Sequence, residues 1–276
     1  MSFAEVNGIK ICYEMHGDGY PIILVEEYGA KKEGWIAQIG PLSEHFKVIT
    51  LDNRGSGKSD RPNYPYTMEM FADDIKGLID FLGLKKAHIV GKSLGGMIVQ
   101  EFALKYSQYV NKLVLLNTST GYPSDQGPEM YKRGKIDEYY AILKDPVKFF
   151  FEDIKAGFSR EFRKLIQEDP KRKFHGLWSA EDLIKESTID PTTPQDIGNQ
   201  ANALKGFHPL EELHKIKSET LILGAEKDRV MSVYNQQQMH ERIPNSTLKI
   251  LENTRHSSNL EKAPEVNQIL IDFLKD

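Results

Sequence analysis

Three residues that lie far apart in the chain have the types and the order needed for nucleophilic catalysis: Ser93, Asp228 and His256. A serine hydroxyl is too weak an acid to attack a carbonyl near neutral pH, so a histidine must take its proton as the new bond forms. A carboxylate must then fix the tautomer of that imidazole and stabilise the imidazolium. We therefore interpret Ser93 as the nucleophile, His256 as the general base and Asp228 as the orienting acid.

Each of these residues follows a short apolar run that is typical of a buried strand, at 87–90, 221–223 and 248–251. Ser93 is also the centre of the motif Gly-Lys-Ser-Leu-Gly (91–95), between a predicted strand and a predicted helix. Such a sharp turn strains the central residue, and only small neighbours let the chain fold back so tightly. We expect Ser93 at a helix N-terminus, where the N–H of Leu94 can donate to an oxyanion.

Together these motifs resemble the α/β-hydrolase superfamily, in its branch of small esterases, enol-lactonases and carbon–carbon bond hydrolases with a helical cap. The matching stretches are spread over nearly the whole chain: 52–59, 91–96, 224–230, and Arg255 and His256 with Glu261 and Pro264 behind them. The resemblance implies an α/β fold with a mostly parallel eight-stranded sheet flanked by helices. It also implies a core of residues 1–121 and 205–276, with a helical cap at 122–204 inserted after the sixth strand.

The rest of the chain alternates strand-like and helix-like segments. Further strands are predicted at 9–15, 22–25, 47–51 and 113–116, and helices at 66–82, 97–106 and 264–274. Between about 122 and 204 the sequence predicts helices rich in aromatic residues. These aromatics suggest a mostly apolar pocket, although aromatic residues at helical spacing are more often simply core. They are Tyr131, Tyr139, Tyr140, Phe149, Phe150, Phe151, Phe158, Phe162, Phe174 and Trp178.

The segment Glu26, Glu27, Tyr28 departs from the resembling family. Its members usually carry His-Gly there, followed by a bulky residue whose N–H is the second oxyanion donor. Tyr28 can still supply that N–H, because only the backbone is needed. A carboxylate about 6 Å from the oxyanion, however, would oppose it by roughly 3 kcal/mol at an effective dielectric of about 20. That energy corresponds to a rate about a hundredfold lower.

A second departure is Arg255, which stands where the family usually has glycine. We hypothesise that Arg255 pairs with Glu26 or Glu27 and so restores a near-neutral rim around the site. The alternative is that all three are solvated loop charges. Lys92 is interpreted as a side chain packed beside the serine, because the mechanism does not require its charge.

Other residues offer competing interpretations. Asp228 could be only a turn residue after a strand, in which case Asp125 or Glu226 would be the acid. Residues 55–59, Gly-Ser-Gly-Lys-Ser, look like the end of a phosphate-binding loop. That motif requires its first glycine at position 52, however, and the chain has Asp52 there. The segment that follows cannot open a helix to hold phosphate. The resemblance instead makes this stretch structural, with Arg54 buried or paired beneath the floor of the site.

Composition limits the function classes. The chain has 276 residues, 39% hydrophobic and 28% charged, with a net charge of −4, so non-specific nucleic-acid binding is not expected. Its single cysteine, Cys12, is expected to be a buried inert thiol. No export signal and no run of about 18 apolar residues is visible, so we expect a cytoplasmic protein without a membrane span. The histidines and carboxylates show no metal-ligand spacing, and neither a metal nor a cofactor is expected.

The expected function is therefore hydrolysis of a small carboxylic ester or lactone through an acyl-enzyme. One alternative is cleavage of a carbon–carbon bond by the same residues. Another is a weakly active or non-catalytic relative that binds a small ligand, because Glu26 and Glu27 replace the usual His-Gly. Epoxide hydrolysis and dehalogenation are disfavoured, because those relatives carry aspartate where this chain has Ser93. No segment of the sequence indicates an oligomeric interface.

Overall fold

A computed structural model describes residues 1–122, 124 and 126–275. Over these residues the chain forms an eight-stranded sheet in the order β1-β2-β4-β3-β5-β6-β7-β8. Strands β1 and β2 are antiparallel to their neighbours and the others are parallel, so the sheet is mostly parallel, as the resemblance implies. The strands are β1 (Ser2–Val6), β2 (Ile9–His16), β3 (Pro21–Val25), β4 (Lys47–Leu51), β5 (Ala87–Lys92), β6 (Val110–Leu116), β7 (Glu219–Ala225) and β8 (Ser246–Leu251).

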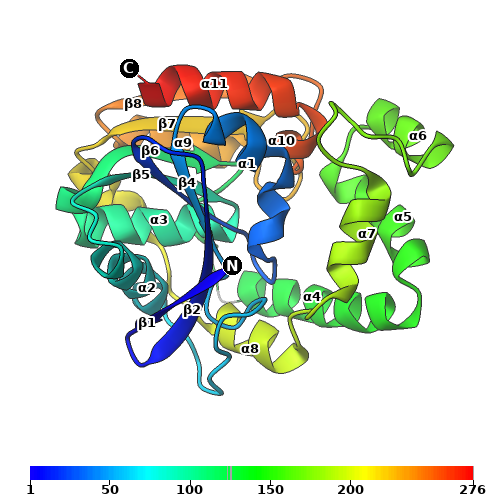
Figure 1. Cartoon of the computed structure of the whole chain (residues 1–276), viewed down its shortest axis with the longest axis horizontal. Helices are drawn as coiled ribbons and strands as arrows, with labels where there is room; N and C mark the ends of the chain where they lie inside the picture. The colour runs from blue at the N-terminus through cyan, green and yellow to red at the C-terminus, as the bar shows by residue number, and fades with distance from the viewer. Residues whose placement is uncertain (123, 125, 276) are drawn as a thin grey trace.

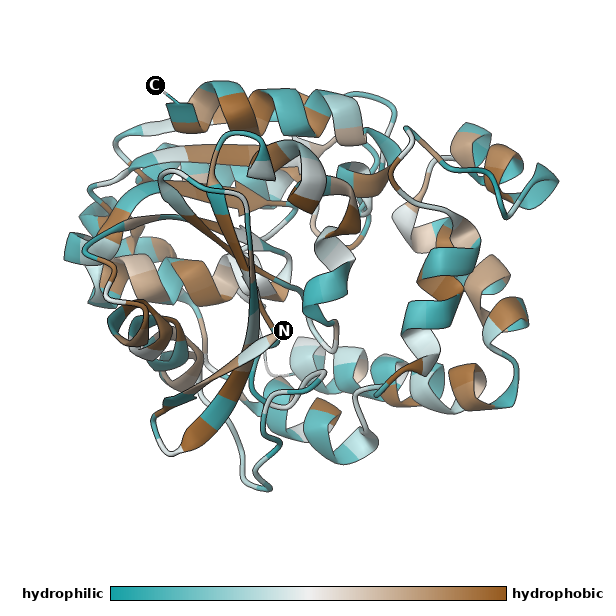
Figure 2. Ribbon diagram, in the orientation of Figure 1, coloured by the Kyte–Doolittle hydropathy of each residue, from teal (hydrophilic) through white to brown (hydrophobic). Residues whose placement is uncertain are grey.

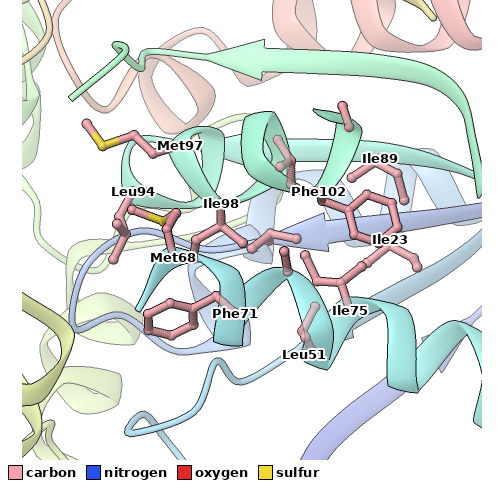
Figure 3. Close-up of a cluster of buried hydrophobic side chains, with 14 of the residues drawn as sticks. Ile23, Leu51, Met68, Phe71, Ile75, Ile89, Leu94, Met97, Ile98 and Phe102 are labelled. Atoms are coloured by element: carbon pink, nitrogen blue, oxygen red, sulfur yellow. The ribbon is translucent and has the colours of Figure 1, made fainter. Parts of the chain in front are cut away.

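Helices cover both faces of the sheet (Figure 1). Successive side chains of a strand point to opposite faces, so Ile23 joins the cluster under α2, α3 and α9, whereas Ile22 joins the cluster under α1 and α11. Figure 3 shows Phe71 and Phe102 of the first cluster. Burial on both faces explains the continuous apolar runs of these strands. The helices are α1 (Ile36–Ser43), α2 (Met68–Phe81), α3 (Leu94–Lys105), α9 (Val233–Arg242), α10 (Ser258–Glu261) and α11 (Ala263–Lys275), with 3-10 turns at Lys32–Trp35, Ser107–Tyr109 and Pro209–Lys215.

A helical insertion (126–202) separates β6 from β7 and extends to one side of the sheet (Figure 1). Hydrophilic and hydrophobic residues alternate along its helices (Figure 2). Side chains cap four of these helices: Asp145 caps α5, Ser159 caps α6, and Ser179 and Thr193 open capping boxes on α7 and α8. The helices of the insertion are α4 (Gln126–Lys144), α5 (Pro146–Gly157), α6 (Arg160–Glu168), α7 (Ala180–Thr188) and α8 (Pro194–Asn202).

Many aromatic residues of the insertion pack against one another. The rings of Phe158 and Trp178 lie 5.6 Å apart, and those of Phe162 and Phe174 lie 4.7 Å apart. With neighbouring apolar residues they form a separate buried cluster. These four aromatics therefore pack in a cluster that joins the insertion to Ala37, Leu260 and Ala263 outside it.

The segment 52–59 after β4 is scaffold. Arg54 is buried and makes two hydrogen bonds of 2.6 Å to the carboxylate of Asp74. The Asp52 carboxylate accepts the backbone N–H groups of Lys32 and Lys58, so the amide of Lys58 is already used within the protein. The stretch thus stabilises the turn beneath the sheet edge, as the resemblance implies.

The predicted helices and strands differ from the structure mainly at their ends. The helix predicted at 66–82 begins at Met68 because the Thr67 side chain accepts the N–H of Met70. Strand β1, which sequence periodicity does not single out, is the antiparallel edge strand of the sheet and pairs with β2. Cys12 is fully buried, which raises its pKa to about 11. In the described parts of the chain, every helix is too short or too polar to cross a membrane.

Candidate active site

Ser93 occupies the sharp turn between β5 and α3. Its backbone has φ 52° and ψ −118°, a strained conformation for a residue other than glycine. The turn needs its glycines: a Cβ at Gly91 would lie 2.2 Å from the Gly95 carbonyl oxygen, and one at Gly95 would lie 2.1 Å from that of Val25. The predicted nucleophile therefore sits at the start of a helix, with Leu94 as the first helical residue.

Asp228 and His256 meet at the same edge of the sheet, beyond the ends of β7 and β8. His256 Nδ1 lies 2.8 Å from Asp228 Oδ2. The other carboxylate oxygen of Asp228 accepts the N–H groups of Val230 and Met231, which fixes its orientation. Asn117 donates to the His256 carbonyl at 2.6 Å and holds the loop that carries the histidine. The side chain of Asp228 is fully buried, so the imidazole is oriented by a fixed acid.

The other ring nitrogen of His256 is not hydrogen-bonded. His256 Nε2 is buried without a partner among the described residues, so no hydrogen bond joins it to Ser93. A carboxylate oxygen of Glu27 lies 3.6 Å from this nitrogen. Burial alone would lower the pKa of His256, but the hydrogen bond to Asp228 and the nearby Glu27 outweigh it and raise the pKa. The imidazolium form of His256 is thus more stable here than in a free imidazole.

The loop that follows β3 is tied to the helical insertion. The Tyr28 hydroxyl donates to the Ile197 carbonyl at 2.5 Å. The Gly29 N–H donates to Gln200 Oε1 at 3.0 Å, and the Gly29 carbonyl accepts from the Thr192 hydroxyl at 2.8 Å. Gln200 also donates to the Arg54 carbonyl. The backbone of Tyr28, the predicted second oxyanion donor, is therefore positioned by contacts with helix α8 and the segment before it.

Residues 20–263 match the profile of the alpha/beta hydrolase fold. The chain belongs to this family. Among curated proteins it is similar to the proline iminopeptidase PfmaB of Pestalotiopsis fici, at 26% identity over 274 residues covering 95% of each chain. It is also similar to the putative carbamate hydrolase RutD of Caulobacter segnis, at 28% identity covering 100% of this chain and 99% of that protein.

Solved structures show the same fold along the whole chain. The enol-lactonase of Burkholderia xenovorans LB400 superposes with a TM-score of 0.82 at 22% identity and 100% coverage of both chains. A meta-cleavage product hydrolase of Pseudomonas fluorescens IP01 has a TM-score of 0.79 at 24% identity, covering 100% of this chain and 97% of that one. Family membership and these hydrolytic relatives support hydrolysis as the general class of reaction.

The charges beside the serine have partners that differ from the sequence-based hypothesis. Lys92 Nζ lies 2.9 Å from Glu27 Oε2, and the Lys92 side chain is only 5% exposed. Arg255 does not pair with either glutamate in the described structure; its guanidinium donates to the Lys155 carbonyl at 2.7 Å. The interpretation of Lys92 as mere packing was also incomplete. Lys92, not Arg255, neutralises Glu27.

The order of the strands in the sheet explains why Lys92 is the partner of Glu27. Strands β3 and β5 are parallel neighbours with Val25 opposite Gly91, so the residues that follow them come out side by side at the same edge of the sheet. Burial alone would raise the pKa of Glu27, but Lys92 and His256 reverse this effect and hold it well below its usual range. Burial alone would lower the pKa of Lys92, but Glu27 and Glu26 raise it. Both groups are therefore charged.

Glu26 lies beneath this pair and is not a solvated rim charge. It is only 1% exposed, and its Oε2 accepts the backbone N–H of Glu27 at 2.8 Å. Burial raises its pKa to about 7, against the attraction of Lys92. The solvated-loop alternative is therefore wrong for Glu26.

A cavity of about 270 Å³ lies between the loop after β3 and the insertion. Of the ten aromatic residues expected to favour an apolar pocket, Tyr139 is the one that lines it. Apolar walls come from Ile142, Leu183 and Ile197, and they alternate with charged side chains. Those charged side chains are Glu26, Glu27, Lys31, Glu33, Lys92, Lys135, Glu138 and Glu186.

Of the alternative acids, Glu226 takes no part in this arrangement. The carboxylate of Glu226 accepts the N–H of Asn253 and is exposed. Asp125 lies outside the described residues. In the described parts of the chain, no group of three or more His, Cys, Asp or Glu side chains is arranged to hold a metal ion.

Proposed function

We propose that the chain is a serine hydrolase of a small carboxylic ester or lactone, with Ser93 as nucleophile, His256 as general base and Asp228 as orienting acid. The observation that carries this proposal is the 2.8 Å contact between His256 Nδ1 and a buried, doubly hydrogen-bonded Asp228. His256 Nε2 makes no hydrogen bond in the described structure and lies at the edge of the sheet where Ser93 occupies its strained turn.

The reaction proceeds in two steps, acylation of Ser93 and hydrolysis of the acyl-enzyme. Ser93 Oγ attacks the ester carbonyl while its proton passes to His256 Nε2, and that proton is then given to the leaving alcohol oxygen. Water attacks the acyl-enzyme, loses a proton to Nε2 and releases the acid, and the same proton returns to Ser93 Oγ. The N–H groups of Leu94 and Tyr28 donate to the oxyanion in both steps. The missing Ser93–His256 hydrogen bond forms when substrate binds, as is common for catalytic contacts that are loose in a free enzyme.

The ion pair of Glu27 and Lys92 makes this chemistry compatible with a carboxylate at the site. An isolated carboxylate would oppose the oxyanion by roughly 3 kcal/mol. A lysine 2.9 Å from that carboxylate leaves a pair with no net charge. Lys92 thus takes the role that was predicted for Arg255.

In this proposal the helical insertion is the cap, with domain boundaries at 122–204 for the cap and at 1–121 and 205–276 for the core. The substrate is a small molecule held in the cavity between Tyr139 and the end of β5. No nucleic acid, membrane or cofactor takes part, and the protein acts in the cytoplasm.

A second candidate is a non-catalytic relative that binds a small ligand. Its specific support is the position of Glu27, whose carboxylate lies 3.6 Å from His256 Nε2 and competes for the atom that Ser93 must reach. Cleavage of a carbon–carbon bond would use the same three residues and is a variant of the first proposal.

Labelling of the serine tests the proposal. The protein and its Ser93→Ala variant are incubated with a fluorophosphonate probe and measured by intact mass, alongside turnover of short p-nitrophenyl esters. We expect one label and ester turnover in the native chain, and neither in the variant. A folded native chain that takes no label and turns over no ester would contradict a hydrolase and support the ligand-binding alternative.

A further inference from the structure

The backbone of His256 is held from two sides. Its carbonyl accepts a side-chain N–H of Asn117, which follows β6 in the core, at 2.6 Å. The N–H of the next residue, Ser257, donates to the carbonyl of Gly157, the last residue of α5, at 2.9 Å. The peptide group between His256 and Ser257 is therefore fixed at one end by the core and at the other end by the helical insertion.

The insertion makes further contacts with the segment that follows His256. Trp178 Nε1 donates to the Leu260 carbonyl at 3.1 Å, and both residues belong to the same buried apolar cluster. His175 Nε2 lies 2.9 Å from the Glu261 carbonyl oxygen. Ser257 and Leu260 also line the cavity, so a substrate in the cavity would lie against the segment that the insertion holds.

One side chain joins this segment to the insertion on both sides of His256. Glu261 Oε2 accepts the hydroxyl of Thr254 at 3.0 Å, which closes the loop 254–261 around the histidine. The same oxygen accepts the backbone N–H of Ser159, which caps α6, at 2.9 Å. Thr254, Ser159 and Glu261 are 8% exposed or less. A buried donor that loses its acceptor is costly, so the oxygen of Glu261 keeps the loop and the insertion together.

We propose that Glu261 is a positioning residue for His256, which ties the backbone on both sides of the general base to the helical insertion. Among the described residues its side chain bonds to Thr254 and Ser159 and to no catalytic residue, so it acts through the loop. His256 Nε2 has no hydrogen bond to Ser93 here, and a misplacement of about 1 Å in a reacting group can lower a rate about a hundredfold. The proposal rests on the proposed hydrolase function for the rate, whereas the position of His256 can be tested without turnover.

Two variants of Glu261 test the role of its oxygen. Glu261→Leu removes the acceptor, and we expect kcat for a p-nitrophenyl ester to fall at least about tenfold, with little change in KM. Glu261→Gln keeps an oxygen that can accept both hydrogen bonds and should retain most of the native kcat. Glu252→Leu replaces an exposed glutamate just before the same loop, so it is the matched control and should keep the native kcat.

A milder variant covers the case in which Glu261→Leu does not fold. Thr254→Val removes one of the two donors with little change of shape and leaves the contact between Glu261 and Ser159 in place. We expect a smaller fall in kcat, again without a matching change in KM. A native kcat in a folded Thr254→Val variant would show that closing the loop does not position the histidine.

The titration of His256 tests its position without turnover. Its imidazole NMR signal is assigned by its loss in His256→Gln. Burial lowers the pKa of His256, but Asp228 and Glu27 face the ring and outweigh burial. An imidazole that moves away from these carboxylates should therefore titrate closer to the ordinary value of about 6.5. We expect a lower midpoint in Glu261→Leu, and the native midpoint in Glu261→Gln and in Glu252→Leu.

Three results would overturn the positioning role. They are a native kcat in Glu261→Leu, a loss of kcat that is equally large in Glu261→Gln, and a titration of His256 that Glu261→Leu leaves unchanged. Failure of the hydrolase function is seen in the native chain itself, which would take no fluorophosphonate label and turn over no ester. In that case a lower midpoint of His256 in Glu261→Leu would still support the positioning role.

Discussion

Two ion pairs at the edge of the sheet have different roles. Arg54 and Asp74 meet through two hydrogen bonds of 2.6 Å, and each side chain is 3% exposed. Lys92 and Glu27 meet through one contact of 2.9 Å, and Glu27 keeps 28% of its side-chain surface exposed. The Arg54–Asp74 pair is shielded from solvent, and both of its hydrogen bonds are formed. The Lys92–Glu27 pair faces the cavity and lies beside His256. The buried Arg54–Asp74 pair can therefore stabilise the scaffold, whereas the partly exposed Lys92–Glu27 pair can act on substrate.

Breaking the Arg54–Asp74 pair should have the largest effect, on stability. Arg54→Met leaves the buried carboxylate of Asp74 without its cation, which costs about 3–5 kcal/mol of the free energy of unfolding. Denaturant unfolding measures the loss. Turnover per folded molecule should stay near the native value, and a large fall in turnover without a loss of stability would refute the scaffold role.

Breaking the Lys92–Glu27 pair should instead affect catalysis. Lys92→Met leaves Glu27 uncompensated near the oxyanion, and we expect kcat/KM to fall about a hundredfold, or roughly 3 kcal/mol. Ester turnover measures this fall. The double variant Lys92→Met with Glu27→Gln removes both charges and should recover most of the activity. If the double variant is as slow as the single one, Lys92 acts through something other than the charge of Glu27.

The tether between the loop after β3 and α8 gives a smaller effect. Gln200→Leu removes the acceptor of the Gly29 N–H, and we expect kcat to fall about tenfold, with little change in KM, as the Tyr28 backbone loosens. Gln200→Glu keeps an acceptor and should retain more of the native kcat. Equal losses in both variants would show that the bond to Gly29 does not matter for the rate.

The smallest expected effect is a shift in the pH dependence of the activity. Neutral His256 is the general base, and Asp228 and Glu27 outweigh burial and raise its pKa. Activity should therefore be absent at low pH and rise through a midpoint above the ordinary histidine value of about 6.5. Glu27→Gln removes one of the two carboxylates and should shift this midpoint of kcat/KM to lower pH. A midpoint that moves upward would show that Glu27 does not stabilise the imidazolium.

Much of the fold could be predicted from the sequence because local patterns determine it. The apolar runs correctly indicated the buried parallel strands, and the glycines around Ser93 identified the turn that strains it. The edge strand β1 was missed because its exposed and buried residues alternate over only five positions.

The partner of Glu27 could not be predicted in the same way, because it depends on strand order. Arg255 and His256 are consecutive residues, yet their side chains take different directions, one to Lys155 and the other to Asp228. Knowledge that β3 and β5 are neighbours would have indicated Lys92, which is the last residue of β5.

The central claim is that Ser93 forms a covalent acyl-enzyme beside a neutralised carboxylate. Rapid acid quench of an ester reaction, followed by intact-mass and peptide analysis, tests this most directly. The account predicts a mass increase equal to the acyl group, on the peptide that contains Ser93, and its absence in Ser93→Ala. Ester turnover that persists in Ser93→Ala, with no acylated peptide from the native chain, would contradict it.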